Sequence, residues 1–242
     1  GKRHVSITLA DTKIDIQEVN RIFKLSWPVA ISQAVAQLGF IIINSLILSY
    51  GESTVNAFTT GNRINSFVLL PATGIGTVAA TFVGQNIGAR KTDRAKKSVS
   101  AAMLLGIITS VIGAFILMPI RAEVISIFLD AQPEALKLSI EYMFFVLCGL
   151  PLMSMHQIYL GIYQGSGETK LSLTLALLRL WLFRIPLVLI FKNIFHLPQS
   201  CIWYAMTISN AGSGFVGAIL YTRCRFEPKI KIDSEELDVV YA

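Results

Sequence analysis

Long runs without charged side chains are the feature that most constrains this chain. No Asp, Glu, Lys or Arg occurs in five separate stretches, which are 25–51, 64–89, 98–120, 142–167 and 193–222. Each is longer than the roughly 20 residues that an α-helix needs to cross about 30 Å of hydrocarbon. A sixth apolar stretch, 171–191, carries only the charges of Arg179 and Arg184. Six such runs in series predict an all-α, polytopic membrane protein with a six-transmembrane-helix bundle.

The composition agrees with lipid as the solvent. Hydrophobic residues make up 53% of the chain and charged residues only 15%, whereas soluble domains carry about 25% charged residues. Lysine and arginine outnumber aspartate and glutamate by 21 to 15, but they lie mainly in short segments between the apolar runs. A nucleic-acid-binding protein would gather them on a folded soluble surface, so nucleic acid is not an expected partner.

The basic residues also predict the orientation of the chain. Most of them lie in 1–24, in 90–97, at Lys170 and in 223–242. With six crossings, all four of these regions fall on one side of the membrane, and the positive-inside rule places that side in the cytoplasm. We therefore expect a multi-pass protein of the cell membrane with both termini in the cytoplasm.

The predicted spans divide the chain into three parts. Residues 1–21 are expected to form a cytoplasmic linker, 22–224 a six-helix transmembrane lobe and 225–242 a charged cytoplasmic tail. The spans are expected at about 22–50, 54–89, 93–119, 134–164, 168–195 and 198–223. Residues 120–133 are expected to be a loop with at most one interfacial helical turn. The chain begins with Gly1 instead of Met, from which we expect a fragment or a processed chain.

Prolines interrupt three of the predicted spans. Pro71, Pro151 and Pro186 each remove a helix hydrogen bond that lipid cannot replace. Helices broken in this way recur in transporters, where they bend, but prolines also make static packing kinks, and the sequence leaves both interpretations open. Pairs of small residues at four-residue spacing predict close helix packing; these are Gly84 and Gly88, Gly161 and Gly165, and Gly214 and Ala218.

Polar side chains inside the apolar runs are the first candidates for a functional site. On the first span, Gln33, Gln37 and Asn44 recur at intervals that place them on one helix face. Such a stripe either lines an aqueous cavity or joins helices by hydrogen bonds, and the sequence favours neither. With polar groups of the second and fourth spans added, the candidates for the wall of a substrate cavity are Gln33, Gln37, Asn44, Arg63, Asn65 and Gln157.

Charged side chains within the spans are costly in lipid and indicate function by default. Glu141 is the only acid within the spans, and Arg63 and Arg184 are the basic candidates. At 1.5 Å per residue, Arg63 lies roughly 14 Å and Glu141 roughly 10 Å into the membrane, so Glu141 can pair with Arg63 or Arg184. Alternatively, Glu141 stays at the headgroups and the arginines, Arg179 among them, extend to the interface. We interpret His156 as a hydrogen-bonded core residue.

Sequence signatures of enzymes are missing. The chain has no HExxH motif, no GxSxG motif, no phosphate-binding loop and no intramembrane pair of aspartates. The three cysteines show no metal-ligand spacing. We therefore expect no catalytic residues, no metal site and no organic cofactor.

Several motifs of the second to fifth spans resemble one transporter family. The second span contains Gly-Asn-Arg-Ile-Asn-Ser-Phe, then Leu-Pro-Ala, and ends on Gly-Gln-Asn-Ile-Gly-Ala before a basic loop, over residues 61–97. The fourth span contains Gly149-Leu150-Pro151 and ends on Gly-Ser-Gly-Glu-Thr at 165–169, and the fifth contains Arg184-Ile185-Pro186. These segments resemble the multidrug and toxic compound extrusion (MATE) family, and the resemblance covers about residues 20–224.

The resemblance implies a fold, partners and an activity. MATE transporters have twelve helices in two six-helix lobes around a central cleft, and this chain resembles the second lobe. It would then pair with an N-terminal six-helix lobe, contact membrane lipids and bind small organic substrates. The family exports organic cations and other amphipathic compounds in exchange for sodium or protons. Some members hold cation-binding acids in the first and fourth helices of this lobe.

This chain departs from the family pattern at those acids. The first predicted span has no acid, and the fourth has only the shallow Glu141. We therefore expect the coupling ion, sodium or a proton, to bind mainly outside this half. Two alternatives stay open: a lipid-linked precursor flippase of the same superfamily, which Arg63 and Arg184 keep open and a basic cavity would favour, and a non-transporting membrane interaction module.

Overall fold

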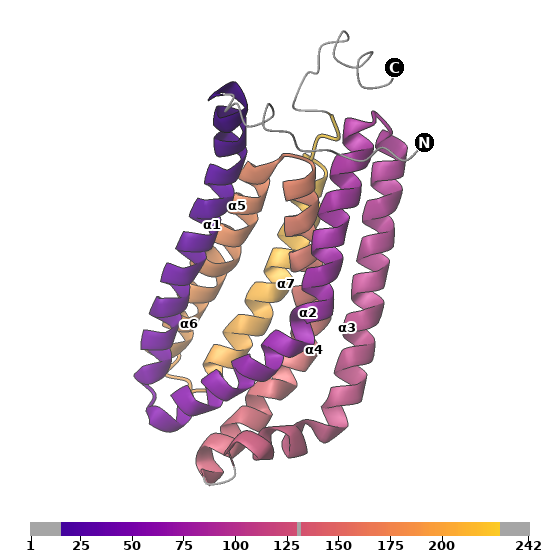
Figure 1. The fold of residues 1–242 in the computed structure, drawn as a ribbon. Helices are drawn as coiled ribbons and strands as arrows, with labels where there is room; N and C mark the ends of the chain where they lie inside the picture. Colours follow the sequence, from indigo (N-terminus) through magenta and orange to yellow (C-terminus); the bar gives the residue numbers. More distant parts are fainter. Residues whose placement is uncertain (1–15, 130–131, 228–242) are drawn as a thin grey trace, which may run out of the picture.

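The computed structural model describes residues 16–129 and 132–227, and all regular structure in these residues is helical. Within these described residues, seven α-helices and one π-helix follow one another (Figure 1). They are α1 (Ile16–Leu48), α2 (Glu52–Gly88), α3 (Thr92–Leu129), α4 (Pro133–Gly165), α5 (Thr169–Leu177), the π-helix η2 (Leu178–Arg184), α6 (Ile185–Asn193) and α7 (Cys201–Tyr221). The predicted all-α bundle is confirmed.

The helices form one membrane lobe with six crossings. Five segments are long and apolar enough to span a membrane, and α5, η2 and α6 together make one of them, Thr169–Asn193. The sixth crossing is α7, whose apolar sequence is interrupted by the buried residues Ser209, Asn210 and Ser213. The outside of the bundle carries exposed apolar side chains such as Phe115 and Phe215, which suit contact with lipid or with another apolar surface.

The packing order places α4 and α7 inside the bundle. α4 packs on α2, α3 and α7, whereas α1 packs mainly on α5. α7 also contacts η2 and so joins the two groups of helices. The start of α1, the turn between α2 and α3 and the end of α7 all lie at one end of the bundle (Figure 1), which agrees with the prediction that their basic residues share one side of the membrane.

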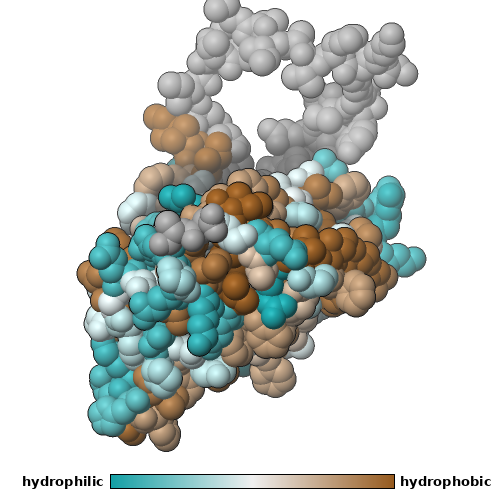
Figure 2. All heavy atoms as spheres, turned by 90° about the horizontal axis from the view of Figure 1, so that it is seen from below, coloured by the Kyte–Doolittle hydropathy of each residue, from teal (hydrophilic) through white to brown (hydrophobic). Residues whose placement is uncertain are grey.

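Polar residues occupy the opposite end of the bundle. Figure 2 looks at this end and shows hydrophilic residues spread among hydrophobic ones. Here the Ser53 hydroxyl donates to Glu134 over 2.9 Å, and Asn56 donates to Gln132 over 3.0 Å. These bonds join the start of α2 to the start of α4 at the expected membrane surface.

Two predicted boundaries differ from the structure. α1 begins at Ile16, inside the segment predicted as a linker, while residues 1–15 and the tail from residue 228 lie outside the described residues. α3 does not end at Pro119 but continues to Leu129, so most of the predicted loop is helix. Ile125 and Leu129 are buried in the core, and this apolar face keeps the segment helical after the bend visible in Figure 1.

The predicted fifth span is continuous, but its helix type changes from α to π and back to α. Pro186 lies at the start of α6, directly after the π-helix η2. Proline has no N–H to donate and its ring presses against the carbonyl four residues earlier. The wider π turn accommodates both effects. Pro71 and Pro151 lie inside α2 and α4, where helix continues through them.

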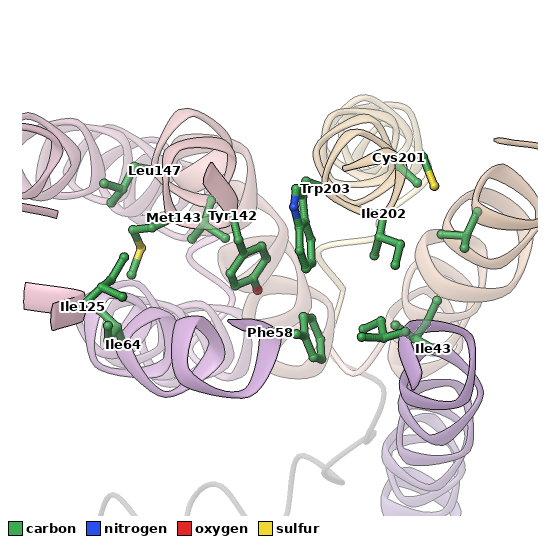
Figure 3. Close-up of a cluster of buried hydrophobic side chains, with 14 of the residues drawn as sticks. Ile43, Phe58, Ile64, Ile125, Tyr142, Met143, Leu147, Cys201, Ile202 and Trp203 are labelled. Carbon is green, nitrogen blue, oxygen red and sulfur yellow. The ribbon is translucent and has the colours of Figure 1, made fainter. Parts of the chain in front are cut away.

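A cluster of aromatic side chains joins α2, α4 and α7. The ring centroids of Tyr142 and Trp203 are 4.5 Å apart, and those of Phe58 and Tyr142 are 5.6 Å apart. Figure 3 shows Phe58, Tyr142 and Trp203 directed toward one another between the three helices. Tilted arrangements of this kind are favourable for aromatic pairs, and they fix these helices beside the cavity described next.

Candidate functional site

A small internal cavity lies beside the aromatic cluster, in the middle of the bundle. Its volume is about 70 Å³, and α1, α2, α4, η2 and α7 all contribute to its wall. Its polar lining residues are Asn62, Asn65, Tyr142, Arg184, Thr207 and Asn210. Since one water molecule occupies about 30 Å³ in the liquid, the cavity accommodates about two waters or one small polar group.

Arg184 is the charged group of this cavity, and α7 holds its side chain. Its Nε donates to the Ser209 hydroxyl over 3.0 Å, and its Nη2 donates to Oδ1 of Asn210 over 2.9 Å. The π-helix η2 ends on Arg184 and packs against α7. The unusual winding before Pro186 thus brings a guanidinium group to two acceptors inside the membrane.

The opposite wall of the cavity comes from α2. The Tyr142 hydroxyl donates to Oδ1 of Asn62 over 3.0 Å. A Cβ atom on Gly61 would overlap the ring of Tyr142, so the absence of a side chain at Gly61 lets this ring lie directly on α2. Asn65 is buried, and its Oδ1 has no hydrogen-bond partner in the part of the chain that the structure describes.

A larger, open cleft adjoins the small cavity. It has a volume of about 460 Å³ and is lined from α1 and α2. Phe40 and Asn62 belong to the walls of both spaces. Asn44, Phe58 and Arg63 complete the larger part of the cleft wall. The two spaces together form one site, with an open aromatic part and a small polar end at Arg184.

The structure separates the residues that the sequence proposed as a cavity wall. Asn44 and Arg63 line the open cleft, and Asn65 lines the small cavity. Gln157 instead donates to the Thr73 hydroxyl over 3.5 Å. Gln33 and Gln37 are exposed side chains of α1 and line neither space. The roles of all these residues in transport stay predictions.

The structure also places the intramembrane charges. The hydrogen bonds of Arg184 go to Ser209 and Asn210, and no ion pair of Glu141 with Arg184 or Arg63 occurs among the described residues. Glu141 is partly buried but lines neither space.

His156 is fully buried, yet neither ring nitrogen has a hydrogen-bond partner among the described residues. The structure therefore does not show the hydrogen bonds that the sequence predicts for it.

Sequence reasoning missed Tyr142 and Trp203, and it noted Asn62 and Asn210 as polar residues within the spans without selecting them for the cavity wall. Asn62 and Asn65 are three residues apart on α2 and therefore share a face, so this pair was accessible to pattern analysis. Tyr142, Trp203 and Asn210 meet only through the packing of α4 on α7, which no local spacing reveals.

A separate cluster closes the end of the bundle below the cleft. Lys192 donates to the Ser49 hydroxyl and lies 5.1 Å from the centroid of the Tyr50 ring. The Tyr50 hydroxyl donates to the carbonyl of Leu197 over 3.4 Å and is also 3.4 Å from Sγ of Cys201. Burial raises the pKa of Tyr50 above its ordinary value. The cluster joins the α1–α2 turn to the α6–α7 loop.

The fold and the site define a multi-pass membrane protein that forms one six-helix lobe of a transporter fold. The MatE family model matches residues 28–190. The chain belongs to the MatE family.

Relatives and solved structures agree with this assignment. The probable multidrug resistance protein YoeA of Bacillus subtilis is 22% identical, over 79% of this chain and 41% of the relative. YpnP of the same bacterium, also named a probable multidrug resistance protein, is 26% identical over 73% of this chain and 39% of the relative. A protein named FAD transporter from Shewanella oneidensis is 21% identical over 76% of this chain and 41% of the relative.

The structural neighbours have the same fold. A MOP superfamily transporter from Pyrococcus furiosus matches with a TM-score of 0.85 and 22% identity, over 93% of this chain and 50% of that chain. The MATE transporter VcmN of Vibrio cholerae in its bent form matches with a TM-score of 0.81 and 16% identity, over 88% of this chain and 48% of that chain. The chain thus spans about half the length of these structures and less than half the length of the curated relatives. It has the fold of one lobe, and the relatives named above are two probable multidrug resistance proteins and one FAD transporter.

Proposed function

We propose that this chain is one half of a secondary active multidrug efflux antiporter that works by alternating access. The observation that carries the proposal is the two-part site in the middle of the bundle, where aromatic rings and amides line a cleft of about 460 Å³ that opens from the lobe. This volume lies within the range of about 300–1,000 Å³ typical of small-molecule sites. The multidrug resistance names of the relatives support the same activity.

The proposed substrates are organic cations or other amphipathic compounds. Phe40 and Phe58 offer apolar ring faces, and Asn44 and Asn62 offer hydrogen bonds at the edge of the same cleft. No acid lines the described walls of the cleft or of the small cavity. A cationic substrate would therefore meet its counter-charge in the other lobe.

The remaining parts of the proposal concern coupling and assembly. The coupling ion is sodium or a proton and binds mainly in an N-terminal six-helix lobe, because Glu141 lies away from the site in this half. The two lobes stand in the cell membrane with both termini of this chain in the cytoplasm, surrounded by lipid. Nucleic acid has no part in this function.

The test is dye efflux from cells that express this lobe alone or joined to its N-terminal half. Ethidium retention is measured with and without an inward sodium gradient, after both forms are shown to reach the membrane. We expect efflux only from the joined form, and loss of efflux without the gradient would identify sodium coupling. Alanine at Gln37 and at Asn65, made separately in the joined form, tests the cavity wall that the sequence predicts.

One alternative function has an observation in its favour. The charges on the walls of the site are both basic, Arg63 in the cleft and Arg184 in the cavity, which also suits the pyrophosphate of a lipid-linked precursor. Absence of dye efflux together with flipping of such a lipid in vesicles would establish the flippase. Absence of both activities would leave the non-transporting interaction module.

A further inference from the structure

The small cavity beside Arg184 offers more hydrogen-bond donors than its walls can use. Oδ1 of Asn62 accepts from Tyr142, and Oδ1 of Asn210 accepts from Arg184. Both amides therefore keep an NH₂ group that has no acceptor among the described residues. Nη1 of Arg184 likewise has no acceptor in this part of the chain. These donors belong to α2, α7 and η2, and they outnumber the unpaired buried acceptor of the described wall, Oδ1 of Asn65.

Trp203 adds an independent observation. Its side chain lines the same cavity and is fully buried, and its indole N–H has no acceptor among the described residues. The indole nitrogen can only donate, and a buried donor without a partner costs free energy. Trp203 thus places an unpaired donor next to the cavity.

The charge of the cavity points in the same direction. Arg184 has two neutral partners, and no carboxylate of the described residues lies within ion-pair distance of it or on the wall of the cavity. A guanidinium inside the membrane is costly unless it is paired. Its planar fork matches the oxygens of a carboxylate or a phosphate.

We propose that the Arg184 cavity binds the anionic group, a carboxylate or a phosphate, of an amphipathic organic solute. At about 70 Å³ the cavity holds such a group but not an organic ring system. The adjoining cleft of about 460 Å³, with Phe40 and Phe58 on its wall, takes the apolar part. This inference deepens the proposed function, on which it rests, by adding amphipathic anions to its substrates.

The test is equilibrium dialysis on the purified full-length transporter that contains this lobe, with two flavins as probes. Flavin mononucleotide and riboflavin share one ring system, and only the former carries a phosphate. We expect flavin mononucleotide to bind at least tenfold more tightly than riboflavin. Binding that is no tighter than that of riboflavin, or absent for both, overturns the proposal.

Two variants test whether the preference for flavin mononucleotide over riboflavin arises at the Arg184 cavity. Arg184→Gln should weaken flavin mononucleotide binding at least tenfold and leave riboflavin binding unchanged, which also shows that the variant is folded. Arg179→Gln is the matched control, because Arg179 lies in the same π-helix but lines neither space, and its effect should stay below threefold. A phosphate preference that survives in Arg184→Gln contradicts the site.

Competition and transport separate the remaining outcomes. Inorganic phosphate should compete at least tenfold more weakly than flavin mononucleotide; equal competition would overturn the organic anion and assign the cavity to a free ion. If the anion preference is found but ethidium efflux fails, the anion site stands and the multidrug function fails. If efflux occurs without any anion preference, the function stands and the anion site fails.

Discussion

The two halves of the α2–α4 pair are built in different ways. In the half from Pro71 to Gly88, the backbones touch: a Cβ on Gly161 would overlap the carbonyl of Gly76, and one on Gly165 would overlap that of Ala80. In the other half, a ring fills the interface and the small polar cavity opens beside it. One helix pair thus combines a closely packed part, which fixes the lobe, with a part that has space for a ligand.

Prolines lie near the boundary between these halves on both helices. Pro71 precedes the close contacts of α2, and Pro151 precedes those of α4. Figure 1 shows α2 changing direction along its length, and proline is a common cause of such bends. The comparison indicates that the prolines let the helices diverge around the cavity while they stay in contact at the other end.

The largest loss of stability is expected from adding a side chain where the backbones of α2 and α4 touch. Gly161→Ala places a methyl group against the backbone carbonyl of Gly76, which cannot move as a flexible side chain can. We expect a loss of about 1–3 kcal/mol or more, as for overpacked cores, measured as a lowered midpoint of thermal unfolding in detergent.

The control for this substitution lies on the facing helix. Gly74→Ala adds the same methyl group where no atom lies within 4 Å, and alanine is the better helix former. The midpoint of this variant should not fall. Equal losses in both variants would show that the backbones of α2 and α4 are not fixed at this contact.

In the half with the polar cavity, a change of charge should alter ligand binding more than it alters stability. Asn210→Asp places a carboxylate next to Arg184, which already bonds to the side-chain oxygen at this position over 2.9 Å. The new ion pair would occupy the guanidinium, so flavin mononucleotide binding should fall at least tenfold, which corresponds to about 1.4 kcal/mol. Riboflavin binding and the unfolding midpoint should be retained. Unchanged flavin mononucleotide binding would show that Arg184 does not carry the anion preference.

These two halves were not equally predictable from the sequence. The close half follows from local spacing, since Gly161 and Gly165 form a small-residue pair, for which the sequence predicts close packing, and the structure shows that both lie against α2. Arg184 and Asn65 were found because charge and amides are rare in apolar runs. The partners of Arg184 were not found, because Ser209 and Asn210 reach it only through the packing of η2 on α7. The π-helix before Pro186 was not predicted, because the sequence indicates a break at this proline but not the winding that accommodates it.

A smaller effect is expected at the wall that the aromatic cluster shares with the cavity. Tyr142→Phe keeps the ring contacts with Phe58 and Trp203 and removes only the hydrogen bond of 3.0 Å to Asn62. The loss should be about 1 kcal/mol, the usual net value of one hydrogen bond, seen as a modest shift in the thermal midpoint. A loss as large as that of Gly161→Ala would mean that this half is also fixed by specific contacts.

The smallest change in stability is expected at Gln157. This variant tests where the closely packed half of the α2–α4 pair ends and the ligand-binding half begins. Its side chain makes a long bond of 3.5 Å to Thr73 at an exposed position, whereas its backbone lies against Gly76. Gln157→Ala removes the hydrogen bond to Thr73 and keeps the backbone contact with Gly76. The free energy of unfolding should therefore change by less than about 0.5 kcal/mol. Ethidium efflux by the joined transporter should also be retained, because Gln157 lines neither described space. Loss of efflux at unchanged stability would show that Gln157 belongs to the cavity wall, as the sequence predicts. The part of the α2–α4 pair that binds ligand would then continue past Pro71 and Pro151.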